Sequence, residues 1–116
     1  MLRLPAFLTP LEATLLAALI DGGGFFKHEL ALQLSSSQLK SREFNGYGFF
    51  TTFLIQYDIP RLPWEDYRLH AQAKIGGELC GFMLWIKSGR VDFLEGYPLG
   101  GDEWPESQEV SELKLN

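Results

Sequence analysis

The sequence predicts an α+β domain in which two N-terminal helices pack on one face of an antiparallel sheet of about five strands, as a two-layer sandwich. Three observations support this fold class. Helix signals are confined to the first third of the chain, turn signals separate short strand-forming segments after it, and one such segment alternates cleanly between apolar and polar residues. Residues 1–100 are expected to form one domain. Residues 101–116, rich in Gly, Pro, Ser and acids, are expected to form an acidic, mobile tail.

The first helix has a strong start signal. Thr9 can cap it, Pro10 suits the first helical position, and Glu12 completes a capping box. The glycine run at 22–24 is expected to end this helix. It is not interpreted as a phosphate-binding loop, because the Gly-Lys-Ser/Thr of such a loop is missing. A second helix is predicted over about residues 25–34, where apolar side chains recur at a spacing of four.

The strongest turn signal is Asn45-Gly46, which can supply the two positive φ angles of a two-residue type I′ hairpin loop. In that register Phe44 faces Tyr47. Arg42 and Glu43 precede the turn and point to opposite faces, so they are interpreted as solvated strand-edge charges. The strand after the turn has large apolar side chains on both faces. This indicates either a central strand covered on both sides or an exposed aromatic patch.

Three more strands are predicted over residues 67–75, 78–87 and 90–97, with turns at Gly76-Gly77 and Ser88-Gly89. The proline-containing segment before them is a surface crossing, because proline cannot donate to a central ladder. The sequence leaves the order of the strands open.

Charge and composition exclude several classes of protein. The formal net charge is −5, of which −4 lies from Asp102 onward, so the body carries only −1 and no basic stripe. Nucleic-acid binding is therefore not expected. The single cysteine, Cys80, excludes an internal disulfide and fits a reducing compartment. No apolar run approaches the roughly 20 residues that span a bilayer. A cytoplasmic protein without a membrane partner is expected.

No catalytic or metal-binding motif is assembled in the sequence. His70 is isolated, and two His with one Cys lack the clustered spacing of a zinc site, so no metal or cofactor is expected. Glu95 shares a predicted strand face with Val91 and Phe93, which would turn its carboxylate inward, where it needs a partner. Glu43, His70 and Glu95 are the candidates for a ligand pocket, and none is assigned as catalytic.

Three segments carry a resemblance to a known family: R-E-F-N-G-Y-G-F-F-T at Arg42–Thr51, G-R-V-D-F-L-E-G-Y at Gly89–Tyr97, and E-W-P at Glu103–Pro105. The chain resembles, over residues 30–105, a family of small uncharacterised bacterial proteins, some of which are similar to immunity proteins of toxin systems. The shared features are turn glycines and strand aromatics, so the resemblance implies a common fold. It assigns no catalytic or ligand residue.

Two functions are compatible with these features. The favoured one is a non-catalytic protein-interaction protein, which forms a homodimer or binds a partner as an immunity or regulatory protein does, with acidic residues steering association. The alternative is a small-ligand-binding protein or small enzyme with a pocket between helices and sheet. The candidate interaction residues are Tyr47, Phe49, Phe53, Tyr57, Trp85 and Trp104.

Overall fold

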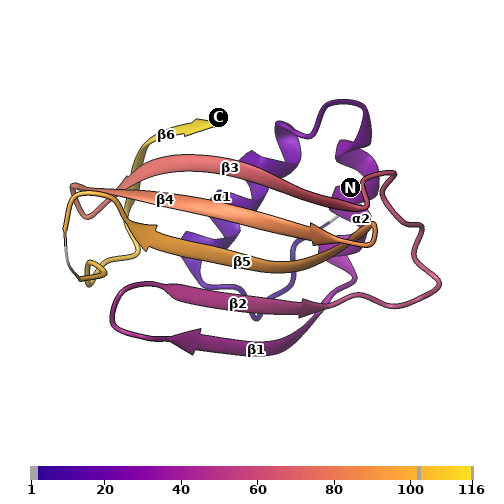
Figure 1. Cartoon of the computed structure of the whole chain (residues 1–116), viewed down its shortest axis with the longest axis horizontal. Helices are drawn as coiled ribbons and strands as arrows, with labels where there is room; N and C mark the ends of the chain where they lie inside the picture. The colour runs from indigo at the N-terminus through magenta and orange to yellow at the C-terminus, as the bar shows by residue number, and fades with distance from the viewer. Residues whose placement is uncertain (1–2, 102, 116) are drawn as a thin grey trace.

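The computed structural model describes residues 3–101 and 103–115. They form two layers, with the helices on one face of a six-stranded antiparallel sheet (Figure 1). The predicted α+β class is confirmed, with one strand more than the sequence indicated. Neither helix in the described ranges is long and apolar enough to cross a membrane.

The helix layer begins as its capping signal predicts. Helix α1 spans Pro10–Asp21, and the Thr9 hydroxyl accepts from the Glu12 N–H at 3.1 Å. In return, the Glu12 carboxylate accepts from the Thr9 N–H at 2.9 Å. After a short 3₁₀ turn, η1 at Gly24–Phe26, helix α2 spans Lys27–Ser35.

The sheet has the order β1-β2-β5-β4-β3-β6, and all hydrogen-bonded neighbours are antiparallel. The strands are β1 Gln38–Phe44, β2 Phe49–Leu54, β3 Asp66–Ile75, β4 Glu78–Lys87, β5 Arg90–Pro98 and β6 Val110–Leu115. The loop after β2 crosses the end of the β4–β5 hairpin to reach β3 (Figure 1). It is fastened there by the Leu62 N–H, which donates to the Gly89 carbonyl at 2.8 Å.

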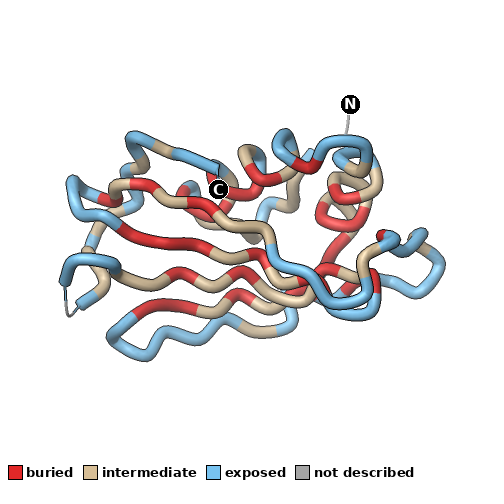
Figure 2. Tube along the Cα trace, turned by 45° about the horizontal axis from the view of Figure 1, so that its top comes forward, coloured by how far each residue is buried: buried red, intermediate tan, exposed pale blue. Residues whose placement is uncertain are grey.

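The core lies between the helices and one face of the sheet, here called the inner face (Figure 2). Alternate residues of each central strand point inward and are buried, as the period of two requires. The main inner-face residues are Phe49, Thr51, Phe53, Ala71, Ala73, Ile75, Phe82, Leu84, Ile86, Val91 and Leu94, and the helices cover them with Leu11, Leu15, Leu16, Leu19, Leu30 and Leu34.

The first hairpin differs from the type I′ prediction. Phe44 pairs with Phe49, so the loop contains the four residues 45–48. The Asn45 side chain accepts from the two loop N–H groups that follow Gly46, and only Gly46 has a positive φ, +85°. Asn45 thus stabilises the loop through its side chain rather than through a left-handed backbone. Because the register moves by two residues, each side chain keeps its predicted face.

The C-terminal segment also differs from its prediction as a mobile tail. Val110–Leu115 form β6, an edge strand on β3, with Val110 and Leu113 packed against the core. Only one face of this strand packs against the core, and the other carries charges such as Lys114, which gave the sequence its polar composition. Asp102 and Asn116, also assigned to the tail, lie outside the described residues.

Candidate functional site

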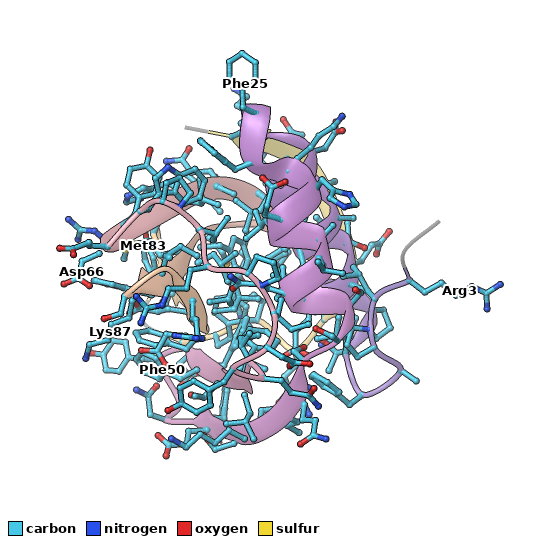
Figure 3. The ribbon with its side chains drawn as sticks, turned by 90° about the vertical axis from the view of Figure 1, so that its right-hand side faces the viewer. Arg3, Phe25, Phe50, Asp66, Met83 and Lys87 are labelled. Carbon is cyan, nitrogen blue, oxygen red and sulfur yellow. The ribbon has the colours of Figure 1, made fainter. Side chains whose placement is uncertain are left out.

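The face of the sheet opposite the helices, here called the open face, carries a row of half-buried aromatic rings. Phe50 on β2 meets Phe93 on β5 edge to face, with ring centroids 5.8 Å apart. Phe93 stacks on Trp85 of β4 at 5.4 Å, and the Arg68 guanidinium lies 4.9 Å from the centre of the Trp85 ring. Phe50 and Met83 project away from the helices (Figure 3). We call Phe50, Phe93, Trp85 and Arg68 the aromatic strip.

A β-bulge places the strip on the open face. The β4–β5 register moves by one residue around Asp92, so Trp85 pairs with Phe93 while Val91 points into the core. The sequence grouped Val91, Phe93 and Glu95 on one face. The extra residue separates Val91 from the other two, and Glu95 therefore faces outward rather than inward.

Glu95 has the partner that its half-buried position requires. Its carboxylate accepts from the Trp85 indole N–H at 3.0 Å. Tyr97 follows on the same face, and partial burial, together with the nearby Glu95 charge, raises the pKa of its hydroxyl. Trp85 is thus held by a stacked ring, a guanidinium and a hydrogen bond, which together fix its orientation within the chain.

The three ligand-pocket candidates lie in one row across the open face. Glu43 pairs with Phe50, which pairs with Glu95, and the row continues through Met83 to His70. Glu95 and His70 are two strands apart, about 10 Å at the usual strand spacing. They face away from the helices, so the expected pocket between helices and sheet does not contain them.

The interaction candidates divide between the two faces. Trp85 lies in the aromatic strip, and Tyr47 and Tyr57 are 64% and 89% exposed in loops. Phe49 and Phe53, at 8% and 4%, lie under the helices and are core residues. The prediction for these two is corrected because the helices cover the odd-numbered face of β2. The even-numbered face, with Phe50, is the exposed one.

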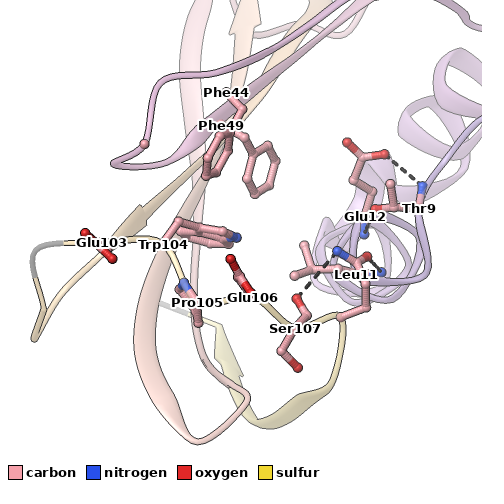
Figure 4. A pocket seen from close by; sticks show the side chains of 12 residues that line it. Thr9, Leu11, Glu12, Phe44, Phe49, Glu103, Trp104, Pro105, Glu106 and Ser107 are labelled. Atoms are coloured by element: carbon pink, nitrogen blue, oxygen red, sulfur yellow. Dashed lines mark hydrogen bonds between the residues drawn. The ribbon is translucent and has the colours of Figure 1, made fainter.

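Trp104 packs at one end of the sheet, beside a cleft (Figure 4). Its ring meets Phe49 and Phe82 edge to face at 5.2 and 5.7 Å, and its backbone N–H donates to the Gly46 carbonyl at 3.3 Å. The cleft encloses about 490 Å³ between this segment and the first turn of α1. Leu11, Phe44, Phe49 and Trp104 give apolar walls, and Glu103, Glu106 and Glu12 contribute carboxylates.

Glu12, in the wall of the cleft, is fully engaged by other groups. Arg42 donates from Nη2 to Oε1 at 2.6 Å and from Nε to Oε2 at 3.2 Å, and the Thr51 hydroxyl donates to Oε2. Burial alone would raise the pKa of Glu12, but the hydrogen bonds from Arg42, Thr51 and the Thr9 N–H outweigh it and lower the pKa. The carboxylate is therefore ionised and structural, and poorly suited to acid–base catalysis.

The sequence indicated Trp85 and the possibility of an exposed aromatic patch, but it did not identify Phe50, Phe93 or Arg68 as its members. The Glu12–Arg42 pair was missed altogether. The strip was detectable in part, because the even-numbered face of β2 carries Phe50 and Leu54. The ion pair had a weaker signal. Any antiparallel register with the observed faces puts Arg42 on the same side as Thr51, so an arginine on a buried face needed an acidic partner.

The remaining candidates for chemistry are inaccessible or scattered. Cys80 is fully buried, and burial, with the nearby Glu78 charge, raises the pKa of its thiol to about 11. Such a thiol is a structural residue rather than a nucleophile. Within residues 3–101 and 103–115, no group of three His, Cys, Asp or Glu side chains is placed to hold a metal ion.

Comparisons of the chain with protein-family models, with curated proteins and with solved structures found no match. Two surface features of the described chain remain as candidates for function. These are the open face with its aromatic strip and the cleft beside Trp104.

Proposed function

We propose that this chain is a non-catalytic protein-interaction protein that binds its partner through the open face. The observation that carries the proposal is the aromatic strip, whose three rings lie on three neighbouring strands and are already packed on one another. Trp and Arg are the residues that most often dominate binding energy at protein interfaces. A tryptophan that Glu95 and Phe93 already orient loses little conformational entropy on binding.

The placement of the titratable groups supports binding over catalysis. Glu95 and His70 lie on the same face but beyond hydrogen-bond reach of each other, and Glu95 is occupied by the Trp85 indole. Both carboxylate oxygens of Glu12 accept hydrogen bonds from Arg42, and Cys80 is buried with a raised pKa. Among these described groups, therefore, no nucleophile is paired with an accessible base.

The cleft favours a second candidate function, the binding of a small ligand. Its volume of about 490 Å³ lies within the range of about 300–1,000 Å³ typical of ligand sites. Titration of a fragment library into ¹⁵N-labelled protein tests it. Chemical-shift changes confined to Leu11, Phe49 and Trp104 support a ligand site, and a library without effect there opposes it.

A photo-crosslinking experiment tests the proposed interaction. A benzophenone amino acid replaces Thr52, a half-buried residue of the open face, and, in a matched control, Ala17 on the solvent side of α1. Irradiation in cells of the source organism is followed by mass spectrometry of the adducts. We expect one stoichiometric protein adduct, with this chain or with another, from position 52 only.

The control position separates specific from nonspecific adducts. Equal adducts from positions 52 and 17, or none from position 52, would overturn binding through the open face. An adduct with a basic protein would support an immunity-type or regulatory role, because the chain carries a net charge of −5.

A further inference from the structure

We infer that the partner on the open face is a second copy of this chain, packed face to face about a two-fold axis that runs along the strands between β5 and β4. The inference rests on the proposed function and names its partner. Two properties of the open face carry it: the charges differ between its two halves, and the aromatic strip lies near its centre.

The charges in the middle of the open face are divided by the line that runs along the strands between β5 and β4. Glu43 and Glu95 lie on the half formed by β1, β2 and β5. Arg68 and Lys114 lie on the half formed by β4, β3 and β6. One half is acidic and the other is basic.

Most of the other charges of this face occur as opposite signs within the same half. Lys74 pairs with Glu112 at 2.8 Å, and Asp66 is the cross-strand neighbour of Lys87. Lys40 and Asp92, one at the bulge of β1 and one at the bulge of β5, have opposite signs within the same half. Arg90 lies over the Tyr57 ring, beyond the end of the strip.

The strand order makes this division self-complementary. In the order β1-β2-β5-β4-β3-β6, an axis along the strands between the two central strands places β5 over the partner's β4 and β1 over the partner's β6. Phe93 then faces the partner's Trp85, because Phe93 and Trp85 are cross-strand neighbours within each sheet. Each aromatic strip packs on its copy, as in aligned sheet sandwiches.

The same axis brings the acidic half of each chain onto the basic half of the other. Glu43 on β1 faces the partner's β6, where the partner's Lys114 lies one same-face step away, about 7 Å along the strand. This is within reach of a long lysine side chain. An axis across the strands would instead place β1 over the partner's β1 and oppose like charges, so the charges select the first arrangement.

The area is sufficient for a stable pair. Six strands at a spacing of about 4.8 Å, each with about eight residues at about 3.3 Å, form a face of roughly 750 Å². A standard protein–protein interface buries about 800 Å² on each partner. The open face thus matches the size of a dimer interface.

Charge reversal tests the arrangement. Glu43→Lys and Lys114→Glu are each expected to weaken dimerisation about tenfold, because each homodimer then contains two like-charged contacts. An equimolar mixture of the two variants is expected to recover the affinity. In that heterodimer one contact is native and the other is reversed, and both are attractive. Sedimentation equilibrium and native mass spectrometry of the purified chains measure both effects.

Glu106→Lys is the matched control, since it makes the same charge change at the cleft, away from the open face. It should leave the dimer affinity unchanged, and circular dichroism should show that every variant remains folded. A wild-type chain that stays monomeric at about 100 μM, well above the μM dissociation constants of specific pairs, would overturn the inference. So would a dimer whose two charge variants fail to recover on mixing.

The crosslinking result separates this inference from the proposed function. An adduct from position 52 with a different protein would leave the open face as a binding surface and remove the second copy as its occupant. The absence of any protein adduct would remove both.

Discussion

Arg42 on β1 and Glu12 in the first turn of α1 form a two-pronged ion pair, with N–O distances of 2.6 and 3.2 Å, that fastens the helix layer to the edge of the sheet. The Thr51 hydroxyl on β2 donates a third hydrogen bond, to Oε2 of Glu12. The Glu12 side chain is almost fully buried while Arg42 is one-third exposed. A buried carboxylate is stable here only because every oxygen has a donor.

Replacement of Glu12 by Gln should lower the free energy of unfolding by about 2 kcal/mol. The amide cannot pair with the Arg42 charge, and its N–H₂ faces the Arg42 or Thr51 donors. Glu29→Gln is the matched control, because Glu29 occupies the corresponding first turn of α2 and should cost no more than about 0.5–1 kcal/mol. Urea unfolding followed by circular dichroism measures both. Equal losses would show that Arg42 does not stabilise Glu12.

The same pair predicts an acid-sensitive contribution to stability. The pKa of Glu12 is lowered in the folded chain from its usual value of 4.5, so the contribution is complete above about pH 4.5 and is lost as the pH falls through the lower folded value. The stability difference between wild type and Glu12→Gln should stay constant from about pH 7 to about pH 5 and shrink as the pH falls below about 4.5. Glu112, whose pKa Lys74 lowers, titrates in both proteins and cancels. A difference independent of pH would contradict the role of the charge.

The helix layer could be predicted from the sequence because its signals are local. The capping box of Thr9 and Glu12 acts over three residues, and the glycine run after Asp21 ends the helix where it occurs. The faces of β2 were also predictable from a period of two. Which face the helices cover was not predictable, since both carry large apolar side chains.

The candidate site depended on features that no local pattern encodes. A single extra residue at Asp92 turns Phe93 and Glu95 outward, and a bulge of this kind leaves alternation looking regular on both sides of it. The contact between Glu12 and Arg42 joins residues 30 positions apart in the chain. It follows from the way α1 packs on the sheet, with its first turn beside Arg42 of β1 and Thr51 of β2, and the sequence alone does not specify that packing.

Gly48→Ala should be severely destabilising. A methyl group at Gly48 would collide with the carbonyl oxygen of Gly96 on the neighbouring strand, where backbone must move to make room. We expect a loss of about 3 kcal/mol in the free energy of unfolding. Gly100→Ala is the control, because a methyl group there meets no atom within 4 Å. Similar melting temperatures for the two variants would contradict the close approach of β2 and β5.

Removal of residues 110–116 should weaken the fold from the β3 edge. The deletion removes Val110 and Leu113 from contact with the core and leaves β3 paired with β4 alone. We expect a loss of about 2 kcal/mol, from the apolar surface that these two side chains bury. Hydrogen exchange should accelerate in β3 and remain unchanged in β1, at the opposite edge of the sheet. Uniform exchange in both strands would show that β6 is not docked on the sheet.

The Cys80 thiol should not react with a thiol reagent while the chain is folded. Burial raises its pKa to about 11, so the thiolate is scarce at neutral pH, and the sulfur has no exposed surface. Ala17→Cys supplies a second thiol in the same molecule, exposed on α1, as an internal control. Ellman's reagent should release one equivalent rapidly from that variant and the second only after urea unfolding. Rapid release of both would show that the inner face at β4 opens readily to solvent, in conflict with a core that the two helices keep closed.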